Sequence, residues 1–262
     1  MPSLQGDTRN RPDRVRAFES NTPEYHQAFK TFLDHTDQKD KALAWLSQQI
    51  SSLRRRQVLI DVGAGNGKLT AWLMPQFRET IAIEPSASLV EELRVACPSA
   101  TIMPTTIGAA FPAALADFIL CSHVFYYIPR PEWETNLLQM TRWLAPGGML
   151  ALAIQNPHTD CMKMVRFFSG GRLDLGELCG TAESAPGGKF TASVDTVPAQ
   201  IRADDLATAC AVAEFMLNVL PLPTPPRWVD LERYVDEHFR RESRYVFSCD
   251  QDFLRIERDV QS

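Results

Sequence analysis

A glycine-rich segment and a carboxylate further along the chain are the residues whose types and spacing first indicate chemistry. The segment reads Asp61-Val62-Gly63-Ala64-Gly65-Asn66-Gly67 and follows an apolar run. Glycines at alternate positions permit a sharp turn and let a ligand approach the backbone without obstruction by a Cβ atom. Glu84 lies 21 positions after Gly63, where a carboxylate ending a second strand can accept hydrogen bonds from both hydroxyls of a ribose. The pair predicts a nucleotide-like ligand, although a tight strand-to-helix turn would use the same glycines.

Two further features separate the possible nucleotide ligands. Lys68 follows the last glycine, so the third glycine of the dinucleotide pattern G-x-G-x-x-G, which supports helix packing over a pyrophosphate, is absent. S-adenosylmethionine (AdoMet) has no phosphate and does not require that glycine. The second feature is the segment 144–150, LAPGGML, which joins a predicted helix to a predicted strand.

Across residues 57–155 this combination resembles the class I AdoMet-dependent methyltransferases, in which an L-K-P-G-G turn recurs before the fifth strand. The resemblance implies AdoMet as cofactor, with its methionine part on the glycine segment, its ribose on Glu84 and its adenine near the residues after the third strand. Many members have an acid there. This chain has Thr105 and Thr106, so a hydroxyl or a backbone carbonyl would replace it. The predicted cofactor-binding residues are Gly63, Ala64, Gly65, Gly67, Glu84, Pro85, Ser86, Thr105, Thr106, Ser122 and His123.

Short segments also resemble histamine N-methyltransferase and its relatives, in the same order along the chain. They are residues 28–36, 84–87, 125–127 and 202–206. The resemblance implies that N-terminal helices cap the pocket and hold the acceptor amine. The amine-binding glutamate of that family corresponds here to Gln38, and its paired tryptophans fall near Asp160 and Met164. We therefore expect an acceptor other than histamine. We expect the methylated atom to be a nitrogen of an amine, amino-acid-derived or secondary-metabolite compound, and an oxygen acceptor is the alternative.

Methyl transfer from a sulfonium is an in-line displacement, so placing the acceptor lone pair and excluding water can supply most of the catalysis. The candidate catalytic residues are His123, just past the fourth predicted strand, Tyr127, and His35 on the N-terminal helix. Each has a structural alternative. His123 could bond local backbone, either Tyr126 or Tyr127 could belong to the core, and His35 could cap its helix. The predicted substrate-binding residues are Tyr25, Phe29, Gln38, Tyr126, Asn156 and Asp160.

The elements that must position these residues alternate between strand and helix, which predicts βαβ units. Expected strands cover residues 58–62, 80–84, 101–103, 117–121 and 149–154, with helices between them. Beyond residue 200 we expect a helix over 202–213, a strand near 215–219, a helix over 229–240, and two closing strands at 245–247 and 253–256 that could form a hairpin. The predicted fold class is α/β: a Rossmann-like, mostly parallel sheet with an antiparallel strand near the C-terminus, helices on both faces and an N-terminal helical cap.

The predicted organisation is a flexible N-terminus, residues 1–16, followed by a single methyltransferase domain, residues 17–262. Its expected parts are a helical cap (17–53), the AdoMet-binding core (57–155), a substrate-side insert (156–200) and the C-terminal part of the sheet (201–262). Residues 169–200 are glycine-rich and aperiodic, which predicts an irregular segment. Together with the N-terminal helix it would form a mobile cover over the acceptor.

The composition limits the kinds of partner and site that we expect for this chain. The formal net charge of −5 argues against a general electrostatic grip on nucleic acid. The six cysteines are scattered without a C-x-x-C pair, which predicts no metal site, and no apolar run reaches the ~18 residues of a membrane helix. We expect a cytoplasmic enzyme, monomeric or homodimeric, acting on a small molecule. The alternatives are an NAD(P)-dependent oxidoreductase and a non-catalytic AdoMet-binding protein.

Overall fold

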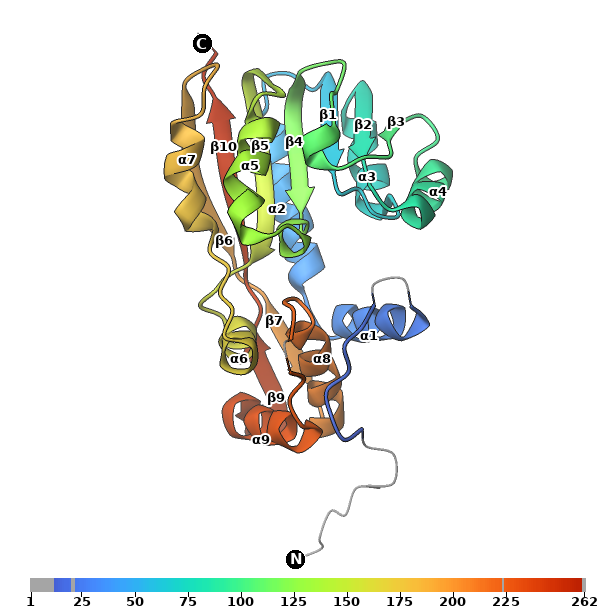
Figure 1. The fold of residues 1–262 in the computed structure, drawn as a ribbon, viewed down its shortest axis with the longest axis vertical. Helices are drawn as coiled ribbons and strands as arrows, with labels where there is room; N and C mark the ends of the chain where they lie inside the picture. Colours follow the sequence, from blue (N-terminus) through green and yellow to red (C-terminus); the bar gives the residue numbers. More distant parts are fainter. Residues whose placement is uncertain (1–11, 20–21, 223, 261–262) are drawn as a thin grey trace, which may run out of the picture. The chain divides into compact units, whose positions relative to one another are not determined.

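The computed structural model describes residues 12–19, 22–222 and 224–260. The chain divides into two compact units, each built from three segments (Figure 1). The sheet unit comprises Ala42–Gln155, Asp174–Val197 and Gln251–Ser262. The helical unit comprises Met1–Lys41, Asn156–Leu173 and Pro198–Asp250.

A seven-stranded sheet forms the sheet unit, in the order β3-β2-β1-β4-β5-β10-β6. Its strands are β1 (Val58–Val62), β2 (Glu79–Ile83), β3 (Thr101–Met103), β4 (Ala116–Ser122), β5 (Leu144–Gln155), β6 (Phe190–Val197) and β10 (Gln251–Arg258). Strands β1 to β5 pair in parallel, and β10 pairs antiparallel with both β5 and β6. The predicted Rossmann-like sheet with one antiparallel strand near the C-terminus is confirmed.

Apolar strands explain why this sheet is buried on both faces. Every residue of β1 is buried, as are the first six of β4, which is the pattern of central parallel strands. On one face, Leu46 and Ile50 of α2 (Gln38–Ser52) pack with Leu59, Phe118 and Phe253. Figure 1 shows α5 (Trp133–Thr141) in front of the strands and α2 behind them. The remaining helices of this unit are α3 (Lys68–Leu73), α4 (Ala87–Ala96) and α7 (Cys179–Glu183).

The helical unit holds four helices and a second, three-stranded sheet among its described residues. The helices are α1 (Pro23–Asp34), α6 (Asp160–Ser169), α8 (Leu206–Leu217) and α9 (Trp228–Phe239). The strands β7 (Gln200–Ala203), β9 (Arg244–Ser248) and β8 (Arg240–Arg241) pair in that order. Thr22 caps α1 by accepting a hydrogen bond from the Tyr25 N–H, as a helix N-cap residue should.

The N-terminal segment is fastened to this unit by a buried acid. Glu214 of α8 is 0% exposed and accepts hydrogen bonds from the Arg16 side chain and backbone, with Arg16 Nη2 at 2.5 Å. Val15 N–H donates to the Pro226 carbonyl at 3.0 Å. Residues 15 and 16 thus have defined partners, and residues 1–11 lie outside the described part of the chain, so the flexibility expected for residues 1–16 stays a prediction.

Three predictions about the second half of the chain are wrong, and one strand was missed. Residues 215–217 end α8 instead of forming a strand, because Asp205 caps a helix whose continuous apolar run hides its period. Strand β7 was not predicted. The closing strands β9 and β10 exist, but they belong to different sheets and form no hairpin. Residues 169–200 are not irregular throughout, since they contain α7 and β6, and β6 pairs along β10 over Phe190–Val197. The mobile cover expected over residues 169–200 stays a prediction.

The described residues contain neither a candidate membrane-spanning helix nor a candidate metal site. None of the helices there combines the length and apolar character needed to cross a bilayer. Within the same residues, no three or more His, Cys, Asp and Glu side chains are grouped so that they could hold a metal ion.

Candidate functional site

The carboxyl ends of the parallel strands meet at one edge of the sheet unit. The strand order reverses between β1 and β4, and ligands of open α/β sheets bind outside the carboxyl ends at such a switch point. The glycine segment follows β1, Glu84 follows β2, and Ser122 and His123 end and follow β4. The predicted cofactor residues of the sequence thus come together at this edge.

All three glycines of the segment adopt the left-handed backbone region, at φ of 70° for Gly63, 57° for Gly65 and 80° for Gly67. A Cβ atom on Gly63 would lie 2.2 Å from Val124 Cγ2, and one on Gly67 would lie 2.8 Å from Leu93 Cδ1. A Cβ atom on Gly65 would meet no atom within 4 Å. Gly63 and Gly67 therefore serve internal packing, whereas the Gly65 backbone faces open space from which a ligand can approach.

Glu84 is buried, 5% exposed, and holds the glycine segment through a hydrogen bond to Gly65. Its Oε2 accepts a hydrogen bond from Gly65 N–H at 2.8 Å, and its Oε1 accepts one from Ser86 N–H at 2.9 Å. Each carboxylate oxygen has a second lone pair, so Glu84 can still accept one hydroxyl on each oxygen. It can bind a ribose and shape the loop at the same time, and the second role was not predicted.

Sequence reasoning missed Asp61, a second acid under the same loop. Asp61 is 3% exposed and accepts a hydrogen bond from the Thr70 hydroxyl at 2.6 Å. Burial, with a smaller contribution from the nearby charge of Glu84, raises the pKa of Asp61 to about 6 against the lowering effect of the Thr70 hydrogen bond. An acid inside the apolar run V-L-I-D-V was the signal that could have found it. Two carboxylates at this edge favour a ligand that carries positive charge.

His123 and Tyr126 lie together at the same edge. His123 has a left-handed backbone, φ 59°, and its N–H donates to the Ala153 carbonyl at 2.8 Å. Its Nδ1 lies 3.2 Å from Tyr126 Oη, which accepts a hydrogen bond from Gln155 N–H at 2.6 Å. Burial lowers the pKa of His123 to about 4 and raises the pKa of the Tyr126 hydroxyl, so both are neutral near pH 7.

Tyr127 is separated from this pair. Its side chain is 71% exposed, at the end of the 3-10 turn η4 (Phe125–Tyr127). Packing therefore leaves Tyr126 half-buried and Tyr127 at the surface. The catalytic role predicted for Tyr127 stays a prediction.

The remaining predicted cofactor residues surround the loop ends. Ala64 is buried, Pro85 and Thr106 are exposed, and Thr105 is half-buried. Ser86 begins α4, and its Oγ lies 3.0 Å from the hydroxyl of Ser88. The Thr106 hydroxyl makes no cap hydrogen bond to η3 (Ile107–Ala109), so it is free to serve another partner.

The other predicted site residues lie in the helical unit. The polar ones among them form hydrogen bonds with backbone atoms of that unit. His35 Nδ1 lies 2.8 Å from the Thr31 carbonyl, at the C-cap of α1. Gln38 is buried, and its Nε2 donates to the Cys249 carbonyl at 2.6 Å. Asn156 Oδ1 accepts from His158 N–H at 2.7 Å.

Asp160 and the two aromatic candidates also contact residues of the helical unit. Asp160 Oδ2 accepts from Ser248 N–H at 2.9 Å. The rings of Tyr25 and Phe29 pack against Phe215, with centroids 5.7 and 5.6 Å away. The predicted site residues are thus divided between the two units, and the substrate roles of those in the helical unit stay predictions.

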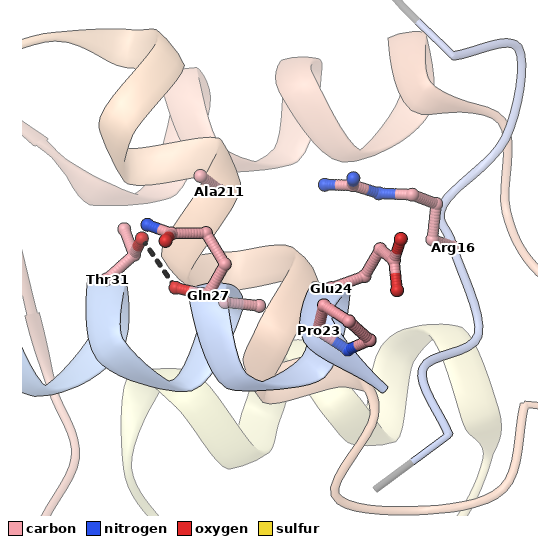
Figure 2. A pocket seen from close by; sticks show the side chains of 7 residues that line it. Arg16, Pro23, Glu24, Gln27, Thr31 and Ala211 are labelled. Atoms are coloured by element: carbon pink, nitrogen blue, oxygen red, sulfur yellow. Dashed lines mark hydrogen bonds between the residues drawn. The ribbon is translucent and has the colours of Figure 1, made fainter. Parts of the chain in front are cut away.

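Figure 2 shows a pocket of about 550 Å³ in the helical unit. It is lined by Arg16, Pro23, Glu24, Gln27, Ala28, Thr31 and Ala211. The Thr31 hydroxyl donates to the Gln27 carbonyl at 3.0 Å within α1. None of the predicted substrate residues lines this pocket, so the sequence gave no reason to expect it.

Comparisons with known proteins identify a matching family and proteins of similar fold. A family model described as a methyltransferase domain matches residues 33–178. Among curated proteins, the chain is similar to "Probable methyltransferase ltbC" of Aspergillus luteorubrus, 28% identical over 145 residues that cover 50% of this chain and 51% of that protein. The chain spans about half the length of the curated relatives it matches.

Two solved structures share the fold. One is the N-methyltransferase NodS from Bradyrhizobium japonicum WM9 in complex with S-adenosyl-L-homocysteine, with a TM-score of 0.55, 15% identity, and coverage of 90% of this chain and 99% of that one. The other is magnesium protoporphyrin IX methyltransferase from Synechocystis PCC 6803 with bound SAM, with a TM-score of 0.52, 11% identity, and coverage of 92% and 87%.

Proposed function

The chain belongs to the methyltransferase domain family, and from this premise we propose that it transfers a methyl group from AdoMet to a small-molecule acceptor. The observation that carries the proposal is the edge between β1 and β4, where the open Gly65 backbone lies beside Glu84. The oxidoreductase alternative is not favoured, because the loop lacks the glycine that a pyrophosphate needs and the family is one of methyltransferases.

AdoMet is the cofactor, as the sequence predicted, and the residues present fit it. Glu84 keeps one lone pair on each oxygen for the ribose hydroxyls. Gly65 leaves room for a close approach to the backbone. Asp61 and Glu84 contribute negative potential below the loop, which suits a cationic ligand. The glycine segment, through the open backbone at Gly65, would hold the methionine part, and Glu84 would hold the ribose; Gly63 and Gly67 would shape the turn.

AdoMet supplies an electrophilic methyl group on a cationic sulfonium when it is bound. The protein residues have to position both reactants and keep water out. A neutral His123 at the ligand edge avoids the repulsion that an imidazolium would exert on a sulfonium. Asp61 acts in the same direction, since its ionised form attracts the positive charge.

For the acceptor we propose a nitrogen nucleophile of an amine, amino-acid-derived or secondary-metabolite compound other than histamine. Gln38 supports the exclusion of histamine. It is neutral, and its amide already donates to the Cys249 carbonyl, so it cannot supply the carboxylate that best holds a protonated amine. A protein of the same fold is named an N-methyltransferase.

A thermal-shift screen of AdoMet, S-adenosylhomocysteine, NAD and NADP tests the cofactor. A ligand that binds the native state alone stabilises it by about 2.7 kcal/mol at a concentration of 100 Kd. We expect a rise in Tm with AdoMet and S-adenosylhomocysteine and none with NAD or NADP. A rise with the dinucleotides alone would reverse the assignment.

Turnover of labelled AdoMet with a panel of amines, amino acids and phenols tests the reaction. Label transferred to an amine supports the proposal, whereas binding of AdoMet without transfer to any acceptor favours the non-catalytic alternative. Histamine as the best acceptor by a wide margin would overturn the proposed specificity. A cytoplasmic location, a monomeric or homodimeric state, and the absence of nucleic-acid and membrane partners belong to the same proposal, of which the net charge of −5 supports the absence of a nucleic-acid partner.

A further inference from the structure

His123 has a backbone conformation that its side-chain type does not favour. Among the described residues, His123 and Glu242 are the non-glycine residues with positive φ, at 59° and 54°. Glu242 lies in the turn between β8 and β9, where such values are ordinary. His123 directly follows the central strand β4, outside any hairpin. Strained residues of this kind persist only where their surroundings fix them.

Side chains from two other parts of the sheet unit fix the ring of His123. Its Nε2 lies 2.5 Å from Nε2 of Gln251, and its Nδ1 lies 3.2 Å from Tyr126 Oη. Gln155 N–H in turn donates to Tyr126 Oη at 2.6 Å. Both ring nitrogens therefore have a partner from the protein, and the imidazole is held at two points.

Gln251 comes from the first position of β10. The register of β10 against β5 pairs Gln251 with Gln155, so the antiparallel strand begins at the same edge where the parallel strands end. Gln251 is 4% exposed, and its Oε1 is buried without a hydrogen-bond partner among the described residues. A buried amide with an unsatisfied oxygen costs free energy. Leucine of similar size would avoid that cost, so stability alone does not explain a glutamine here.

The turn held by this network packs onto the glycine segment. Val124, the next residue, occupies the space of a Cβ atom on Gly63, with its Cγ2 2.2 Å from that position. A shift of the turn after β4 therefore moves Val124 against or away from Gly63. The backbone that approaches the ligand is mechanically linked to the His123 ring.

We infer that Gln251 and Tyr126 are positioning residues, which act through the His123 ring to hold the turn after β4 against the glycine segment of the cofactor site. This inference rests on the proposed function and deepens it. It assigns His123 a positioning role in place of a general base, because neither ring nitrogen is free to receive a proton from an acceptor. Gln251, which lies 128 positions from His123, was not among the residues predicted from the sequence.

Two variants of Gln251 test the inference. Gln251→Leu keeps the volume and removes the contact with His123. We expect its Kd for S-adenosylhomocysteine, measured by calorimetry, to rise about 3- to 10-fold, which is the loss of one neutral hydrogen bond. An affinity within twofold of the wild type would contradict the inference.

Gln251→Glu adds a readout that a purely structural residue would not move. A carboxylate beside Nε2 favours the imidazolium. We therefore expect the His123 ring, followed by NMR of labelled histidine, to titrate at a higher pH in Gln251→Glu than in the wild type. An unchanged titration would show that the two side chains are not in contact in solution, and would overturn the inference even if Gln251→Leu fails to fold.

Thr80→Val is the matched control. Thr80 lies in β2 of the same sheet, and its hydroxyl is also buried without a partner among the described residues. We expect wild-type affinity and an unchanged His123 titration in Thr80→Val. Loss of affinity in the control as well would show a general effect of altering the sheet and refute the specific link. If the wild type binds neither AdoMet nor S-adenosylhomocysteine, the proposed function fails, which is a different outcome from equal binding by wild type and Gln251→Leu.

Discussion

Substitution of Glu84 by glutamine is the most direct test of the cofactor site. In the structure each carboxylate oxygen accepts one backbone N–H, from Gly65 and Ser86, at 2.8 and 2.9 Å. A glutamine amide has one oxygen, so it can accept from only one of the two and turns an NH₂ group toward the other. The change removes the negative charge and at least one hydrogen bond to the ribose.

The expected magnitude follows from the bonds that are lost. A hydrogen bond to a charged group contributes about 1.5–3 kcal/mol, and each 1.4 kcal/mol is about tenfold in Kd. We expect Glu84→Gln to weaken S-adenosylhomocysteine binding about 10- to 100-fold, and Glu84→Ala at least as much. The loop also loses a support, so the Tm of the ligand-free protein should fall.

Calorimetric titration with S-adenosylhomocysteine well below the Tm separates the two effects. Glu79→Gln is the matched control, because Glu79 begins the same strand β2 at its other end and is exposed. Wild-type affinity in Glu84→Gln, with the folded state verified by circular dichroism, would refute the placement of the ribose on Glu84. Equal loss in Glu79→Gln would attribute the effect to net charge instead.

Three further predictions concern buried polar groups. Burial raises the folded-state pKa of Asp61 to about 6. The stability that the folded state gains from protonation of Asp61 is therefore nearly complete below about pH 4 and is lost as the pH rises through 6. We therefore expect the stability of Asp61→Asn relative to the wild type, from urea unfolding, to increase by about 2.5 kcal/mol between pH 4 and pH 7.5, and a pH-independent difference would contradict the burial argument. Thr80→Val removes a buried hydroxyl without a partner and should raise stability by up to about 1 kcal/mol, seen as a higher Tm; a lower Tm would mean that the hydroxyl is satisfied in solution. Glu214→Ala removes the buried acceptor of Arg16, and because Arg16 is half-exposed we expect a moderate loss of about 1–3 kcal/mol. Limited proteolysis should then cut near residues 13–18 faster, and unchanged cleavage would show that Glu214 does not fasten this segment.

Local patterns determined the first half of the fold. Continuous apolar runs such as 58–62 and 117–121 can only be buried strands when helices separate them, because parallel strands are covered on both faces. The alternate glycines and Glu84 predicted the cofactor edge for the same reason, since the ends of parallel strands meet there. Asp61 could have been predicted too, as an acid in an apolar strand.

Tertiary structure decided what depends on pairing between distant segments. Tyr126 and Tyr127 are neighbours in sequence, and only the packing beside Gln155 leaves the first half-buried and the second exposed. Two residues separate the closing strands β9 and β10, a spacing that favours a hairpin, yet the strands belong to different sheets.

The same limit applies to single side chains. The Gln38 amide donates to the Cys249 carbonyl, 211 positions away, a contact that no local pattern could predict. Gln251 carried no signal at all, because its contact with His123 arises from the register of the antiparallel strand β10 between β5 and β6. Hydrophobic period reports which face of an element is buried, but not which partner covers it. That choice is made by the free energy of the whole packed chain.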